Sequence, residues 1–239
     1  MKRVVAVLFG FLSSNSNVAC ILSAATSVYL TAFCVFCYQH HQELARHSTR
    51  SERVEERVRA AEMSRSAEIL FVSEIIGAVL PSHPDRDTLA ALIVKESRQA
   101  NIDPLLVTAV IRAESMFKQK AVSHRGAQGL MQLMPTTGKY ISELHNIQPN
   151  GKLDLHDPAT NVRLGVAYLK YLDQKFKGNI QSALIAYNWG PTNLSKALRS
   201  KANPPSQSVQ YARAILSHHT MWRTSLPQPV GNSEPKLLG

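Results

Sequence analysis

Residues 103–135 read DPLLVTAVIRAESMFKQKAVSHRGAQGLMQLMP, and this stretch decides the fold. Asp103 followed by Pro104 is a typical helix start, because the carboxylate accepts hydrogen bonds from free backbone N–H groups and proline needs no such bond at the first position. Apolar residues then recur at three- and four-residue steps, which predicts one apolar helix face. They are Leu106, Val110, Ala113 and Phe117. A glycine-containing loop and a short helical turn over residues 130–134 follow.

Glu114 stands near the end of this helix, beyond the apolar residues Val107, Val110 and Ile111. Apolar surroundings disfavour the charged form of a carboxyl group, so its pKa rises and it can hold a proton near neutral pH. Such an acid can protonate the leaving oxygen of a glycosidic bond. Glu96 also follows an apolar helical face, but only Glu114 has the Gly-Leu-Met-Gln segment 15 residues further on.

The segment AYNWGP, residues 186–191, supplies polar groups that can line the same cleft. Tyr187 can hydrogen-bond the acid or stack on a sugar, or it can be an ordinary buried tyrosine. The amide of Gln132 can donate to and accept from acetamido groups of a sugar. Met134 is either core filler or a substrate contact. The histidines lack the close spacing of metal ligands, so the sequence predicts no metal site.

The remaining helix-start and helix-end signals predict helices and no strands. Asp157-Pro158 repeats the capped start and opens a long helix, Gly178-Asn179 ends it, and Gly190-Pro191 breaks the helix over 180–188. Further helices are expected over residues 69–80, after a cap at Asp87, and over residues 207–222. No alternating pattern of useful length appears, so the fold class is all-α.

The N-terminal part is expected to be a membrane anchor with a stalk. After a leader over residues 1–17, residues 18–38 run without a charge for 21 positions, enough to cross a bilayer as a helix. A cleaved signal peptide and lipidation at Cys20 are the alternatives. Residues 39–84 form a charged helical stalk whose thin apolar edge (Val54, Val58, Ala61) lacks sustained heptads. Residues 85–223 form the main domain, and 224–239 a disordered tail.

Positive charge concentrates in the main domain. Residues 83–223 carry 18 Lys and Arg against 9 Asp and Glu, and residues 1–82 carry 8 against 7. This favours an anionic partner such as a lipid surface or an acidic cell-wall polymer. Nucleic acid is excluded, because the chain has no zinc-finger spacing, aromatic RNA-binding signature or dense basic run. All three cysteines precede residue 38, so no disulfide stabilises the domain.

Several short motifs occur in a fixed order. They are Glu114-Ser115, Ser123, Gly126-Ala127, GLMQLMP at 129–135, Asp157-Pro158 with Asn161, Gly165 with Tyr168-Leu169, and AYNWGP at 186–191. Together, over roughly residues 95–220, they resemble the soluble lytic transglycosylase (SLT) domain family, which is similar to goose-type lysozyme. The resemblance implies a lysozyme-like helical fold. It also implies cleavage of the β-1,4 bond between N-acetylmuramic acid and N-acetylglucosamine in peptidoglycan, leaving a 1,6-anhydromuramoyl end and needing no cofactor.

The resemblance also implies residue roles. Glu114 is the single acid and base, and Tyr187 positions or polarises it. Ser123, Gln132, Met134, Asn188 and Tyr211 are the implied substrate contacts. Two departures from the family pattern are Trp189, where a small residue is commoner, and Ala212, where valine usually follows the tyrosine. The second departure makes the role of Tyr211 less secure.

Three hypotheses follow. The first is a lytic transglycosylase held in the inner membrane by a single span, with its domain in the periplasm, or secreted after signal cleavage. The second keeps the fold but hydrolyses the bond, as in goose-type lysozyme, with Asp154 or Asp157 activating water. The third is a non-catalytic peptidoglycan-binding protein that organises a trans-envelope machine.

Overall fold

The computed structural model describes residues 16–147 and 153–226. The expected leader lies outside these residues up to position 15, and the expected tail lies outside them from position 227. Within the described residues the structure is helical, and β structure is confined to two isolated bridges, Val122 with Gln128 and Gln128 with Leu133. The all-α prediction is confirmed. The helices are α2 (Ser16–Val79), α3 (Arg86–Gln99), α4 (Pro104–Ser115), α5 (Pro135–Leu144), α6 (Pro158–Lys175), α7 (Ile180–Trp189), α8 (Pro191–Ser200) and α9 (Ser206–Ser225).

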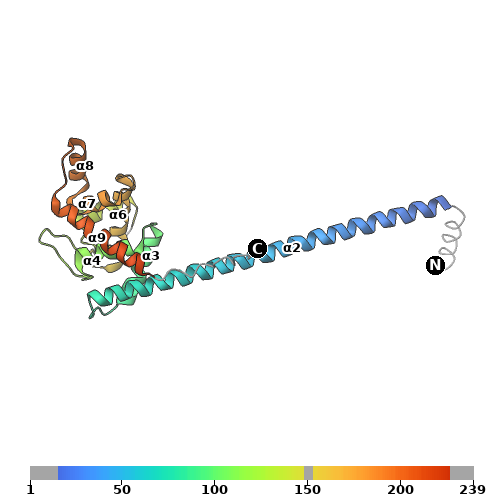
Figure 1. Cartoon of the computed structure of the whole chain (residues 1–239), viewed down its shortest axis with the longest axis horizontal. Helices are drawn as coiled ribbons and strands as arrows, with labels where there is room; N and C mark the ends of the chain where they lie inside the picture. Colours follow the sequence, from blue (N-terminus) through green and yellow to red (C-terminus); the bar gives the residue numbers. More distant parts are fainter. Residues whose placement is uncertain (1–15, 148–152, 227–239) are drawn as a thin grey trace, which may run out of the picture. The chain divides into compact units, whose positions relative to one another are not determined.

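Helix α2 joins three segments that the sequence suggested separately: the apolar run, the stalk and the helix over 69–80. It continues for 64 residues (Figure 1) because no glycine or proline occurs from residue 16 to residue 76. It ends ahead of Pro81. The chain divides into two compact units within this helix, between Ala61 and Glu62.

The first unit is the N-terminal part of α2, whose apolar side chains are exposed. Among them are Val28, Tyr29, Leu30, Phe33, Val35, Phe36 and Tyr38. The run expected to cross a membrane, residues 18–38, lies here, although the side chains of residues 18–22 lie outside the description. In the part of the chain that the structure describes, no helix combines the length and apolar character that a bilayer crossing requires.

The second unit packs its helices around α4. Every residue of α4 from Pro104 to Ile111 is buried, because α3 and α9 both pack against it. Helix α9 also packs on α7, and α7 on α6 and α8 (Figure 1). At the end of α4 the burial is less complete, and Glu114 is partly buried. Ala113, expected on the apolar face, is exposed instead.

The capped helix starts are confirmed. Asp103 accepts from the N–H of Leu105 at 3.0 Å, and Asp157 accepts from the N–H of Thr160 at 2.8 Å. The expected cap at Asp87 is wrong, because α3 begins one residue earlier, at Arg86 after Asp85, and Asp87 accepts a hydrogen bond from Ser73 on α2. The Asp87 side chain thus links α3 to α2 instead of capping its own helix.

Two other local predictions differ from the structure. Residues 130–134 form a turn rather than a helix, because Gln132 takes a left-handed φ of 47° and the bridges hold the segment extended at both ends. Pro191 does not only end α7. It also starts α8, since proline fits the first helical position.

Candidate active site

Glu114 is the second-last residue of α4. The helix stops after Ser115 because Met116 and Phe117 both take left-handed φ values, 51° and 64°. Phe117 is fully buried and anchors this reversal. Burial of the Glu114 carboxyl raises its pKa from 4.5 to about 7, against the opposing effect of a hydrogen bond from Tyr211. The group can therefore hold a proton at neutral pH and release it readily.

Tyr211 of α9 contacts the acid directly. Its hydroxyl donates to Oε1 of Glu114 at 2.5 Å. Burial, and then the charge on Glu114, hold the pKa of Tyr211 well above its usual range, so the phenol keeps its proton. Because a donor stabilises the ionised carboxylate, Tyr211 limits how far burial can raise the pKa of Glu114. The residue with the less secure role in the sequence thus makes the direct contact.

Antiparallel packing of α4 and α9 brings this pair together. At the opposite end of the interface, Oδ2 of Asp103 accepts from His219 Nε2 at 2.9 Å and from Arg223 at 2.5 Å. Asp103 begins α4 and Glu114 ends it, while Tyr211 lies early in α9 and Arg223 late. The contacts at the two ends therefore fix the register of α9 on α4, and this register places the Tyr211 hydroxyl beside the Glu114 carboxyl.

Tyr187 has a different partner from the one expected. Its hydroxyl donates to the backbone carbonyl of Met131 at 2.8 Å. A phenol has one proton, so that proton serves the turn rather than Glu114. Burial and then the charge of nearby Glu114 raise the pKa of Tyr187 well above its usual range, so this phenol keeps its proton. It connects α7 to the segment that precedes Gln132.

Asn161 of α6 organises the turn, a role that the sequence motif did not reveal. This fully buried amide donates to the carbonyls of Gln128 and Leu155 at 2.9 and 2.8 Å, and accepts from the N–H of Met131 at 2.7 Å. Gly129 must be glycine, because its φ is 78° and a Cβ would lie 2.2 Å from the Asn161 side chain. The feature of the sequence that could have indicated this role is an asparagine one helical turn after the cap residue Asp157.

The four other expected contact residues are placed as follows. Ser123 Oγ accepts from the N–H of Ala127 at 3.0 Å, so it closes its own loop. Gln132 Nε2 donates to the carbonyls of Ala121 and Gly129 at 3.1 and 2.8 Å, so its amide nitrogen also serves the loop.

Met134 and Asn188 are available at the surface. Met134 precedes α5 and is 38% exposed, unlike Met131, which is fully buried. Asn188 is exposed at the end of α7, and its oxygen accepts from Ser208 Oγ at 2.8 Å. This contact links α7 to α9 close to Tyr187 and Tyr211 in the sequence.

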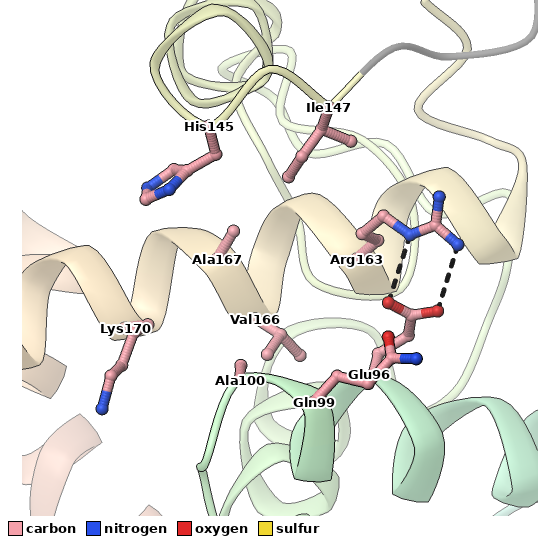
Figure 2. Close-up of a pocket in the computed structure, with 9 residues that line it drawn as sticks. All are labelled: Glu96, Gln99, Ala100, His145, Ile147, Arg163, Val166, Ala167 and Lys170. Atoms are coloured by element: carbon pink, nitrogen blue, oxygen red, sulfur yellow. Dashed lines mark hydrogen bonds and ion pairs between the residues drawn. The ribbon is translucent and has the colours of Figure 1, made fainter.

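The other carboxylates that the sequence analysis considered, Glu96, Asp154 and Asp157, have structural partners. Glu96 is 5% exposed and accepts from Arg163 Nε and Nη2 at 3.1 and 3.2 Å (Figure 2). Asp157 caps α6, and Asp154 Oδ1 accepts from the N–H of His156 at 2.8 Å. Among the described residues, no group of three His, Cys, Asp or Glu side chains can hold a metal ion. Glu114 is thus the carboxyl with an acid–base role open to it.

Comparisons with known proteins agree with this geometry. The model of the family described as Transglycosylase SLT domain matches residues 91–210. The soluble lytic murein transglycosylase of Salmonella typhimurium is 30% identical over 149 residues, which make up 57% of this chain and 23% of that protein. The membrane-bound lytic murein transglycosylase C of Yersinia pestis is 29% identical over 152 residues, 59% of this chain and 42% of that one.

A solved structure is also similar. The lytic transglycosylase Slt of Pseudomonas aeruginosa, in an inactive variant that carries glutamine for a glutamate, matches with a TM-score of 0.52 and 29% identity. The match covers 64% of this chain and 28% of that one. This chain therefore spans less than half the length of each of these three relatives.

Proposed function

The chain belongs to the transglycosylase SLT domain family, and we propose that it is a lytic transglycosylase that cleaves the β-1,4 bond between N-acetylmuramic acid and N-acetylglucosamine in peptidoglycan. The observation that carries this proposal is the state of Glu114. Its carboxyl has a pKa of about 7, set by burial and opposed by the Tyr211 hydrogen bond. A group of that pKa can act in turn as acid and as base at neutral pH.

Glu114 first protonates the glycosidic oxygen, so the bond from the anomeric carbon to that oxygen breaks and N-acetylglucosamine leaves with the proton. The carboxylate that results accepts the hydrogen bond of Tyr211, which stabilises its charge. It then takes the proton of the muramoyl 6-hydroxyl, whose oxygen attacks the anomeric carbon and closes the 1,6-anhydro ring. The nucleophile belongs to the substrate, which agrees with the structural duties of Asp154 and Asp157.

We expect the substrate to contact Met134 and Asn188 when it binds at Glu114. Met134 supplies an exposed apolar side chain and Asn188 an exposed amide. Ser123 and Gln132 shape the loop that precedes Met134, through hydrogen bonds between their side chains and the backbone of that loop. Tyr187 holds the turn in place through Met131. In this proposal Tyr211 acts on Glu114 directly, and the other residues bind or position the glycan.

Analysis of digested peptidoglycan tests the reaction. Purified sacculi are incubated with the wild-type chain and with Glu114→Gln, and the soluble fragments are examined by mass spectrometry. We expect wild type to release fragments lighter by one water than the hydrolysed ones, and the variant to release at least about a hundredfold less. Reducing ends would show hydrolysis instead. Unchanged release by the variant would contradict the role of Glu114.

We also propose that residues 18–38 anchor the chain in the inner membrane, with the domain in the periplasm. These residues carry no charge, and large apolar side chains of α2 between residues 28 and 38 are exposed on every side of the helix. The relative from Yersinia pestis is named as membrane-bound. Alkaline extraction of membranes is the test: the full chain should stay in the pellet, and its N-terminal peptide should be found intact. Extraction into the supernatant would contradict the anchor.

A further inference from the structure

The part of α2 around residue 58 carries a short exposed seam. Val54 and Val58 are 54% and 50% exposed, and Ala61 is exposed as well. The spacing of four residues and then three places the three side chains on one face of the helix, as at the core positions of a coiled coil. In a coiled coil, a face of this kind packs against the matching face of another helix and is removed from water.

The residues that flank this seam have opposite charges on its two sides. Arg57 lies one position before Val58, and Arg50 lies one heptad before Arg57. Glu55 and Glu62 lie one position after Val54 and Ala61. Each arginine therefore precedes a glutamate by five residues. In a parallel pair of helices, the flanking residue of one copy meets the residue five positions later in its partner. Both arginines would then face glutamates.

The same charges oppose an antiparallel pair. There equivalent flanking positions face each other. When Val54 of each copy packs on Val58 of the other, Arg57 would meet Arg57 of the other copy, and Glu55 would meet Glu55. Like charges at these positions are unfavourable. Within one chain Glu55 has only a loose, exposed ion pair with Arg59, at 3.9 Å, which a partner can replace. The charge pattern thus selects both the occupant and its direction.

We propose that residues 50–62 of α2 pair in parallel with the same residues of a second copy of this chain. The seam covers less than two heptads, too few for a stable free coiled coil. The pairing therefore depends on the proposed anchor, which confines the chains to one surface in one orientation and raises their effective concentration. It does not depend on the cleavage reaction, because Glu114 is remote in sequence and belongs to the second unit.

Disulfide trapping of the full chain in lipid vesicles tests the pairing. The three native cysteines are replaced by serine, and a single cysteine is introduced by Val58→Cys, in the seam, or by Glu56→Cys, on the outer face. A parallel pair places position 58 of both copies side by side. Oxidation should link the Val58→Cys chain roughly fivefold faster than the Glu56→Cys control. Equal rates, or no linked dimer, would overturn the proposal. The seam would then have another partner, such as a lipid surface or a different protein.

A charge swap sharpens the test. Adding Arg50→Glu and Arg57→Glu to the Val58→Cys chain should lower the rate to that of the control, and further adding Glu55→Arg and Glu62→Arg should restore it. Insensitivity to the first swap would also overturn the proposal. Flotation of the same vesicles reports the anchor separately. A chain that does not float but still links selectively would contradict both the anchor and the dependence of the pairing on it, while the parallel pairing itself would stand. Fragment release from sacculi reports the cleavage reaction independently of both.

Discussion

Glu96 and Glu114 lie near the ends of consecutive helices, α3 and α4. Glu96 is buried and Glu114 is partly buried, and their surroundings differ. Glu96 faces the guanidinium of Arg163, which donates two hydrogen bonds to it (Figure 2). Glu114 accepts its hydrogen bond from the neutral phenol of Tyr211. Burial raises the pKa of the Glu114 carboxyl to about 7, and the phenol hydrogen bond opposes this only in part. Glu96 thus belongs to an ion pair between helices, and Glu114 is the candidate acid.

The largest expected difference between the two is in activity. Glu114→Gln removes the transferable proton, and we expect cleavage of sacculi to fall by about 10²- to 10⁴-fold. Glu96→Gln should keep the activity per folded molecule within about twofold, since Glu96 touches no reacting group. Fragment release, normalised to the folded fraction by circular dichroism, is the measurement. Equal losses in the two variants would erase the distinction.

For stability the order should be reversed, with the larger loss in Glu96→Gln. Glu96→Gln leaves Arg163 of α6 without its carboxylate partner at the contact between α3 and α6. Removing one member of a buried pair is strongly destabilising, and because Arg163 is partly exposed we expect about 2–3 kcal/mol. Urea unfolding monitored by circular dichroism measures the free energy. A change below about 0.5 kcal/mol, the range of ordinary surface substitutions, would mean that the pair contributes little.

The stability of Glu114→Gln should depend on pH. Between 4.5 and about 7 the unfolded chain ionises this group while the folded chain keeps it protonated. The unfolded state then binds fewer protons, so wild-type stability falls as pH rises through this window. The variant lacks the loss and should gain on the order of 2 kcal/mol over wild type at pH 8, and almost nothing at pH 4. A gain that is independent of pH would contradict this account.

The smallest effect distinguishes the two tyrosines. Tyr211→Phe removes the hydrogen bond that lowers the pKa of Glu114, so the alkaline limb of the activity profile should move to higher pH, with roughly tenfold lower activity at neutral pH. Tyr187→Phe removes the contact with Met131 and should leave that limb in place. A pH profile of fragment release compares them. A larger shift from Tyr187→Phe would reverse the assigned roles.

The sequence predicted the helical class and the starts of α4 and α6, because aspartate followed by proline determines a helix start locally. It predicted Glu114 rather than Glu96 as the acid, because only Glu114 combines an apolar helix with the Gly-Leu-Met-Gln segment 15 residues further on. Other features depended on distant residues. The role of Tyr211 comes from the register of α9 on α4, and the role of Asn161 comes from a turn more than 25 residues earlier in the chain.

Titration of the Glu114 carboxyl by carbon-13 NMR tests the central claim most directly. The side-chain carboxyls of glutamate are labelled in the full chain, and the signal of Glu114 is assigned by its loss in Glu114→Gln. The structure predicts a midpoint near 7, against 4.5 for an ordinary glutamate. A midpoint close to 4.5 would mean that water reaches the group freely, and it would contradict the assignment of Glu114 as the proton donor.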